Sequence, residues 1–259
     1  MASSDESVII LTGASRGIGE AIATFLLTRL ETHKLLLVAR SHAALDQLHY
    51  QYPDRVEVLA GDLSDVNISA KAVDLAISRW GRLDAVIINH STLEPVKKVA
   101  DTSVEEWKKS FDVNVFGAIA IIQAALPHLR ETQGRAILTS SGAAIKAYQG
   151  WGPYGASKAV LNHLALTLSV EEPDVTTISV RPGVVDTEMQ REIREIHRSA
   201  MSEKDVAKYV GLKKDGGLLK PEQPGHVIAK LAVSAPKELS GRFLNWDDGA
   251  LKEFQDDSN

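Results

Sequence analysis

A short apolar strand, a glycine-rich turn and a helix follow one another at the start of the chain. Residues 8–11 form an apolar run, residues 12–19 read Thr-Gly-Ala-Ser-Arg-Gly-Ile-Gly, and apolar residues then recur at helical spacing over 21–30. Glycines let the backbone approach a phosphate, and a helix N-terminus offers free N–H groups and a positive dipole end. The spacing differs from the usual G-x-G-x-x-G, but strand and helix flank it as this mechanism requires. We therefore expect a dinucleotide held through Gly13, Ser15, Arg16, Gly17, Ile18 and Gly19.

Apolar runs of strand length alternate with helical patterns along the rest of the chain. Beyond the first strand, such runs cover 35–39, 55–60, 84–88, 136–139, 176–180 and 242–244, and helical patterns cover 66–80 and 104–130. Alternating strands and helices are typical of a parallel sheet covered on both faces. We predict an α/β Rossmann fold, doubly wound around a mostly parallel seven-stranded sheet, with residues 1–259 in one domain.

Two segments depart from this alternation. Residues 186–220 are polar and helix-prone, and they are too long for an ordinary connection. An insertion beyond the carboxyl end of a strand is well placed to form a substrate lid, although it could instead be a surface excursion. Residues 254–259 are acidic, and we expect them to be frayed.

Composition excludes several classes of function. The 259 residues include no cysteine, which excludes disulfides and thiolate chemistry. Lys and Arg total 29 against 34 for Asp and Glu, so no positive surface for nucleic acid is indicated. The start of the chain lacks the layout of a secretory signal, and no apolar run approaches the ~20 residues that span a bilayer. We expect a cytoplasmic protein without a membrane or nucleic-acid partner, and we assign no metal ligands.

A tyrosine and a lysine four residues apart provide candidate acid–base chemistry. Tyr154 and Lys158 precede an apolar helical run, so both side chains lie on one face if the helix includes them. A nearby ammonium favours the phenolate and lowers the pKa of a tyrosine. Ser141 follows the strand at 136–139 and would bring a hydroxyl to the same place. Such a pair also occurs by chance on many helices, so the rest of the chain must decide.

Charges near the second strand indicate which dinucleotide is bound. An acidic residue near the end of that strand would bind the ribose 2′-hydroxyl of NAD. Here Ala39 and Arg40 stand at this place, with Arg16 in the glycine turn. Guanidinium groups suit a 2′-phosphate, so we expect NADP(H), although both arginines could simply be solvated. Asp62 follows the third strand and could accept a hydrogen bond from adenine or cap a helix.

These motifs, in this order, resemble the short-chain dehydrogenase/reductase family over nearly the whole chain. The glycine turn at 12–19, Ser141, Tyr154, Lys158 and the Pro182-Gly183 turn match its pattern. The resemblance implies an active site of Asn114, Ser141, Tyr154 and Lys158. It implies further cofactor contacts by Leu63, Asn89, Tyr154, Lys158, Pro182, Gly183, Val185 and Thr187. It also implies hydride transfer, with Tyr154 as general acid and Asn114 holding a water near Lys158.

Within the family, the chain resembles the sepiapterin reductase and fungal benzil-reductase-like branch, through residues 93–96, 150–151, 171–173 and 185–190. The family's usual Asn-Asn-Ala-Gly is replaced by residues 88–91, which places Ser91 where glycine is usual. His90 could be an acid or a base, but we expect it to fill a loop position. Asn245 stands where sepiapterin reductases carry an Asp for the pterin, which favours a dicarbonyl substrate. We expect the apolar pocket wall to include Leu93, Tyr148, Trp151 and Met189, each of which could equally be ordinary core.

The sequence therefore predicts an NADPH-dependent carbonyl reductase acting on a small ketone or dicarbonyl. Alternatives are a reductase or oxidase of secondary-metabolite biosynthesis, a pterin reductase, and a non-catalytic NADP-binding regulator. Residues 113–129 and 159–170 look too apolar for helices with one wet face. In the resembling family, helices at these places pack across a two-fold axis, which implies a homodimer or homotetramer.

Overall fold

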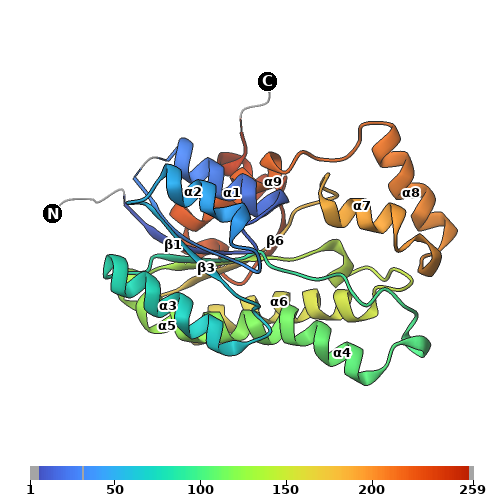
Figure 1. The fold of residues 1–259 in the computed structure, drawn as a ribbon, viewed down its shortest axis with the longest axis horizontal. Helices are drawn as coiled ribbons and strands as arrows, with labels where there is room; N and C mark the ends of the chain where they lie inside the picture. Colours follow the sequence, from blue (N-terminus) through green and yellow to red (C-terminus); the bar gives the residue numbers. More distant parts are fainter. Residues whose placement is uncertain (1–5, 31, 257–259) are drawn as a thin grey trace.

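The computed structural model describes residues 6–30 and 32–256 and contains a seven-stranded sheet. All adjacent strands are parallel, in the order β3-β2-β1-β4-β5-β6-β7 (Figure 1). The predicted α/β Rossmann fold is confirmed, and the sheet is parallel throughout rather than mostly. The strands are β1 Val8–Thr12, β2 Lys34–Ala39, β3 Val56–Ala60, β4 Ala85–Ile88, β5 Arg135–Thr139, β6 Thr176–Arg181 and β7 Phe243–Asn245.

Helices cover both faces of the sheet. In Figure 1, α1, α2 and α9 lie above it and α3, α5 and α6 below, while α7 and α8 project beyond one end. The helices are α1 Gly17–Thr28, α2 Ala43–Gln51, α3 Val66–Trp80, α4 Val104–Phe111, α5 Gly117–Thr132, α6 Gly152–Glu171, α7 Glu188–Glu195, α8 Glu203–Lys214 and α9 Glu222–Ser234. Strand order reverses at β1, whose neighbours are β2 and β4. In such sheets the crevice outside the carboxyl ends of the strands at this switch point is the usual ligand site.

Alternate residues of each central strand enter two separate cores. In β1, Ile9 and Leu11 pack on the side of α1 and α9, while Val8 and Ile10 pack on the side of α3 and α5. Strand side chains alternate between faces, and both faces are covered, so the strand reads as continuous apolar sequence. This burial anchors the strand ends, and hence the turns that follow them, at defined positions.

The helical stretch Val104–Thr132 is long and apolar enough, by length and composition alone, to cross a membrane. It is not one regular helix, because the π-helical turn Asp112–Phe116 separates α4 from α5. The inner face of α5 belongs to the core beneath the sheet, through Ile121, Ile122 and Leu129. The apolar character of the stretch is therefore partly explained by packing against the sheet.

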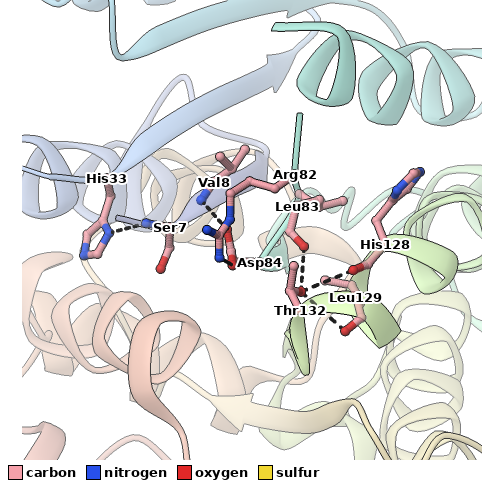
Figure 2. Close-up of polar contacts among 9 residues, drawn as sticks. All are labelled: Ser7, Val8, His33, Arg82, Leu83, Asp84, His128, Leu129 and Thr132. Atoms are coloured by element: carbon pink, nitrogen blue, oxygen red, sulfur yellow. Dashed lines mark hydrogen bonds and ion pairs between the residues drawn. The ribbon is translucent and has the colours of Figure 1, made fainter. Parts of the chain in front are cut away.

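Polar contacts fasten the amino ends of β1 and β4, opposite the crevice. The Asp84 carboxylate accepts hydrogen bonds from the backbone N–H of Val8 at 2.8 Å and from the Arg82 guanidinium at 2.6 and 2.9 Å (Figure 2). Nearby, the Thr132 hydroxyl lies 2.8 Å from the carbonyl oxygen of Leu83. Asp84 is buried, so these partners satisfy a charge that would otherwise be costly in the interior.

The predicted lid segment, 186–220, forms α7 and α8. Its two ends are held together, since the Asp186 N–H donates to the Leu219 carbonyl at 2.8 Å and the Leu219 N–H donates to Val184 at 2.9 Å. Lys213 adds an ion pair to Asp186 at 2.7 Å. The insertion is therefore closed at its base, while α7 and α8 extend past the crevice (Figure 1).

The prediction of a frayed end from residue 254 is wrong for residues 254–256. Phe254 is buried in the core beside α9. The Asp256 carboxylate pairs with Lys230 at 2.8 Å and with His226. The aromatic side chain outweighs the acidic character of its neighbours because its burial is favourable. Residues 257–259 lie outside the described residues.

Candidate active site

One cavity of about 570 Å³ lies at the carboxyl edge of the sheet. It is bounded by the turns after β1, β2, β4, β5 and β6 and by α7 and α8 of the insertion. Of the predicted site residues, only Gly19 and Asn114 do not line it. Those that do are Gly13, Ser15, Arg16, Gly17, Ile18, Arg40, Asp62, Leu63, Asn89, Leu93, Ser141, Tyr148, Trp151, Tyr154, Lys158, Pro182, Gly183, Val185, Thr187 and Met189.

The glycine turn forms one end of the cavity. Gly13 and Gly17 have φ of 66° and 57°, a region that side chains other than glycine rarely adopt. At Gly19 a Cβ would lie 2.1 Å from the carbonyl oxygen of Gly13, so this glycine allows turn and helix to pack rather than touching a ligand. Helix α1 begins at Gly17, and Gly17 and Ile18 of its first turn line the cavity. This cradle fits a pyrophosphate.

Charges around this cradle differ from the sequence-based expectation in one respect. Arg16 and Arg40 both line the cavity, but Glu192 of α7 brings a carboxylate to 3.9 Å from the Arg16 guanidinium. Asp62 is not the cap of α3, which is Asp65. Its carboxylate instead accepts from the Ser64 N–H at 2.9 Å, which together with the nearby Arg40 lowers the pKa of Asp62. Glu192 was missed because it is distant in sequence from both arginines.

The end of β5 and the start of α6 bring Ser141, Tyr154 and Lys158 together. Lys158 is 1% exposed, and its ammonium donates to the Thr139 carbonyl at 2.7 Å while lying 5.8 Å from the centre of the Tyr154 ring. Helix α6 starts at Gly152 with Pro153 in its first turn, so both Tyr154 and Lys158 are helical and share one face, as expected. The four-residue spacing of Tyr154 and Lys158 therefore does not have to be explained as a chance occurrence.

Burial dominates the acid–base properties of this pair. It lowers the pKa of Lys158 to about 7. It raises the pKa of Tyr154, and a hydrogen bond with the Ser141 hydroxyl opposes that rise. The predicted lowering of the Tyr154 pKa by Lys158 is therefore wrong here, because desolvation acts on both groups and weakens the positive charge itself. A tyrosine with a raised pKa is protonated at neutral pH and can donate its proton.

Asn114 lies in the π-helical turn between α4 and α5, behind the cavity wall. Its amide donates to the Thr92 carbonyl at 2.8 Å and to the Ser157 hydroxyl at 3.3 Å, and its oxygen accepts from the Thr92 N–H at 2.8 Å. It therefore ties the loop after β4 to α6. Such turns are common at functional sites. The predicted water near Lys158 stays a prediction.

The loop after β4 supplies Asn89, His90 and Ser91. The Asn89 amide donates to Gly13 at 3.1 Å, which fixes the loop to the glycine turn. His90 donates from Nε2 to the Val113 carbonyl at 3.0 Å, and its Nδ1 lies 2.8 Å from the Thr12 hydroxyl. Burial and the nearby Lys158 lower the pKa of His90 to about 4. With both nitrogens engaged and the ring neutral at pH 7, His90 fills a loop position and has no proton to offer.

Ser91 adds a polar group that the family pattern lacks. It lines the cavity, yet its buried hydroxyl has no hydrogen-bond partner within residues 6–30 and 32–256. An unsatisfied buried hydroxyl is unfavourable, and rotation about one bond would turn it towards the cavity. A ribose hydroxyl is a suitable partner. The glycine cradle, the arginines and this hydroxyl together fit a nicotinamide dinucleotide.

The turn after β6 bounds the cavity beside the glycine turn. Gly183 has a φ of 82°, and a Cβ there would lie 2.5 Å from the side chain of Leu219. Thr187 caps α7 by accepting from the Gln190 N–H at 3.4 Å. Its methyl group would lie 3.0 Å from a Cβ on Gly17, so the turns after β1 and β6 meet. Pro182 and Val185 line the cavity between them.

An apolar cluster forms the wall beside Tyr154. It includes all four predicted pocket residues, Leu93, Tyr148, Trp151 and Met189. The sequence analysis missed Tyr209 of α8, whose ring is stacked on Trp151 with centroids 5.8 Å apart. The available signal was that Tyr209 is the one aromatic residue of the polar segment 186–220. Ile193 and Met201 also belong to the cluster and were missed.

Within the described residues, no group of three or more His, Asp or Glu side chains is placed to hold a metal ion. The site combines a buried tyrosine and lysine, a serine hydroxyl and a dinucleotide cradle beside an apolar wall. This arrangement can exchange a proton with a carbonyl oxygen next to a nicotinamide ring.

Comparison with known proteins agrees with the dinucleotide-binding site described above. Residues 7–198 match the short chain dehydrogenase family. The chain is 35% identical to a benzil reductase ((S)-benzoin forming) of Saccharomyces cerevisiae, over 96% of this chain and 98% of that one. A short chain dehydrogenase/reductase structure from the same yeast has a TM-score of 0.94 at 39% identity, covering 96% and 100% of the two chains. A further yeast structure, described as that of a cytoplasmic protein with unknown function, has a TM-score of 0.83 at 38% identity, covering 96% and 100%.

These relatives place the chain with the fungal benzil-reductase-like proteins. Both the motifs and the fold extend over nearly the whole of each relative. The chain therefore belongs to the short chain dehydrogenase family, as an oxidoreductase that binds a nicotinamide cofactor.

Proposed function

We propose that this protein is an NADPH-dependent reductase of small carbonyl compounds, with dicarbonyls as the favoured class. The observation that carries the proposal is Tyr154, which is protonated, buried, and set between Lys158 and an aromatic wall in the dinucleotide cavity. The raised pKa of Tyr154 keeps the acid form available at neutral pH, which suits carbonyl reduction.

In this proposal, a bound NADPH supplies the hydride. The Tyr154 hydroxyl donates its proton to the carbonyl oxygen as negative charge develops there. Ser141 donates a hydrogen bond to the same oxygen and positions it. In its protonated form, Lys158 lies 5.8 Å from the centre of the Tyr154 ring, so its positive charge favours the phenolate that is left when Tyr154 gives up its proton. Lys158 also binds the nicotinamide ribose. Asn114 holds the loop after β4 against α6, so that Tyr154 and Lys158 on α6 stay in place.

Arg16 and Arg40 support NADPH over NADH. Both residues line the cavity, and Arg40 directly follows β2, where a ribose 2′-phosphate would lie. Glu192 competes for Arg16, but at 3.9 Å and with the Arg16 side chain 57% exposed the pair is weak. Arg40 lies near the Asp62 carboxylate but forms no ion pair within 4.0 Å among the described residues, and it carries more of the proposed selectivity.

A dicarbonyl is supported over a pterin. A relative is named benzil reductase, and the wall beside Tyr154 is rich in aromatic side chains that suit aryl groups. Asn245 is neutral, and its side-chain oxygen lies 3.4 Å from an Arg181 guanidinium nitrogen that it accepts from. A carboxylate that could hold the guanidine-like edge of a pterin is therefore replaced by an engaged amide.

We further infer that residues 186–220 act as a substrate lid. Both α7 and α8 contribute side chains to the cavity, including Met189 and Tyr209. The base of the insertion is held by the pairing of Asp186 with Leu219, so a movement about this base would carry α7 and α8 together. The similarity to a yeast protein described as cytoplasmic supports the same location here.

A homodimer or homotetramer through residues 113–129 and 159–170 is part of the proposal. Phe116 is 50% exposed, Leu166 51% and Val170 79%. These exposed apolar side chains, on the π-helical turn before α5 and on α6, would be covered by the same segments of a second copy. Light scattering at micromolar concentration should give at least twice the chain mass, and a monomer would contradict this part.

The function is tested by following NADPH oxidation with benzil, 2,3-butanedione, a pterin and a steroid ketone as substrates. Reduction of the diketones, with NADPH favoured over NADH, is expected. Reduction of the pterin or steroid ketone alone would favour a biosynthetic reductase. Binding of NADPH without turnover of any carbonyl would favour a regulator and overturn the proposal.

A further inference from the structure

Tyr209 is a buried ring on an otherwise polar helix. Helix α8 carries lysines and acidic residues on its outer surface, but Tyr209 is only 3% exposed. Its ring lies against two aromatic residues from the loop before α6 and from the start of that helix. The centroid distance is 5.8 Å to Trp151 and 6.2 Å to Tyr148. The insertion therefore contributes one ring to the wall of the carbonyl pocket.

Trp151 is held from several sides. The Tyr209 ring is stacked on the indole at an interplanar angle of 14°, and Tyr148 lies 4.8 Å away at 38°. The ring of Tyr154 stands edge-on to the same indole, at 5.9 Å and 88°. The indole is thus fixed between the insertion and the proton donor. Trp151 and Tyr154 both line the cavity, so the indole forms part of the pocket wall next to Tyr154.

The Tyr209 hydroxyl does not act as a proton source. Burial and a hydrogen bond with Tyr148 raise the pKa of Tyr209 further above neutral pH. The Lys208 ammonium lies 5.1 Å from the centre of the Tyr209 ring and 5.7 Å from that of Tyr148. A cation over an aromatic ring is attracted to the face of that ring. The contact with Tyr148 joins α8 to the loop before α6, whereas the contact with Tyr209 lies within α8. The role of Tyr209 is therefore geometric.

We propose that Tyr209 is a positioning residue: it holds the Trp151 indole beside Tyr154, and the resulting slot selects carbonyl substrates that carry a flat aromatic group. An aromatic pair in offset or edge-to-face geometry is stabilised beyond what area burial gives. An aryl ketone gains this from a fixed indole, whereas a methyl ketone gains only from area. This inference rests on the proposed carbonyl reductase function and names its substrate class.

The test compares benzil with 2,3-butanedione in Tyr209→Leu, Tyr209→Phe and the control Val210→Ala. Val210 follows Tyr209 on α8 and is 43% exposed, so it reports the effect of changing the helix without the ring. In Tyr209→Leu the ratio of kcat/KM for benzil over butanedione should fall about tenfold, mainly through KM for benzil, as expected from the loss of one ring contact. Tyr209→Phe keeps the ring and should retain most of the ratio, and the control should retain all of it.

A second readout does not depend on turnover. Loss of the Tyr209 ring should expose Trp151 to acrylamide, and quenching of the tryptophan emission should rise in Tyr209→Leu but not when Trp151 is first changed to Phe. NADPH affinity, measured by fluorescence, should be unchanged in every variant and shows that the cavity is intact. If benzil is reduced but its preference over butanedione survives in Tyr209→Leu, this inference is overturned while the proposed function stands. If the unmodified protein reduces neither diketone, the proposed function fails first, and the substrate class fails with it.

Discussion

The ammonium nitrogen of Lys158 lies 5.8 Å from the centre of the Tyr154 ring, and both side chains are almost completely buried. They are one helical turn apart on α6, so the helix fixes their distance. Burial moves the two pKa values in opposite directions, upwards for Tyr154 and down to about 7 for Lys158. Each group is therefore held closer to its neutral form, and the predictions for this pair follow from that.

Tyr154→Phe keeps the ring but removes the proton. Turnover of an accepted diketone should fall by roughly two orders of magnitude or more, the usual contribution of a general acid. NADPH affinity should change little. Steady-state kinetics and fluorescence titration check both, with Tyr50→Phe as a control because Tyr50 is 89% exposed. Near-normal turnover in Tyr154→Phe would remove Tyr154 as the acid.

Lys158 should make the stability of the protein without bound NADPH depend on pH. Its pKa is about 7 when folded, against the ordinary value of 10.5, so between these values the unfolded chain binds more protons. The free energy of unfolding should therefore rise with pH over that window, by at most about 1.4 kcal/mol per pH unit. Lys158→Met should remove this slope, whereas the control Lys204→Met should keep it. Urea unfolding at several pH values measures both, and equal slopes would contradict the prediction.

His90 should affect the stability of the protein at lower pH values than Lys158 does. Its pKa is about 4 when folded, against the ordinary value of 6.5, so stability is lost as the pH falls from 6.5 towards 4. His90→Gln should flatten the curve in this range, while a change at the exposed His163 should not. At pH 7 His90→Gln should retain most of its turnover, since His90 offers no proton. A loss as large as that of Tyr154→Phe would bring His90 back as the acid.

Arg40→Asp should reverse or erase the preference for NADPH. A carboxylate at this place repels a 2′-phosphate and can accept from a 2′-hydroxyl. Arg40 lines the cavity, so the effect should appear in KM for the cofactor rather than in kcat for the diketone. Arg79→Asp, far from the cavity in an ion pair with Glu57, is the control. Equal KM values for NADPH and NADH in the unmodified protein would exclude the proposed selectivity.

Asp84→Ala should destabilise the amino end of the sheet. The change leaves the backbone N–H of Val8 without its acceptor and Arg82 without its carboxylate (Figure 2). A buried donor left unsatisfied costs about 1–3 kcal/mol. Since Arg82 is partly exposed, water limits the added cost. Urea unfolding midpoints measure the loss, and Glu105→Ala, in an exposed pair with Lys108, should change them little.

Local patterns in the sequence predicted much of the fold. Strand runs and the 66–80 helix agree with β1 to β7 and with α3, because periodicity and turn residues act over short distances. The prediction of one helical stretch was incomplete. The stretch 104–130 was expected to be one helix, but the π-helical turn at Asp112–Phe116 divides it. The spacing of apolar residues does not reveal the extra residue that such a turn contains.

The sequence by itself determined the glycine turn and the shared face of Tyr154 and Lys158, because the turn and the helix are built from neighbouring residues. Only the tertiary structure decided that Glu192 approaches Arg16 and that Tyr209 stacks on Trp151, since these pairs are distant in sequence and meet through packing of the insertion. The tertiary structure also decided the direction in which the pKa of Tyr154 is shifted. A neighbouring charge can be read from spacing, but desolvation depends on how many distant segments close over the group, and here it outweighs the charge.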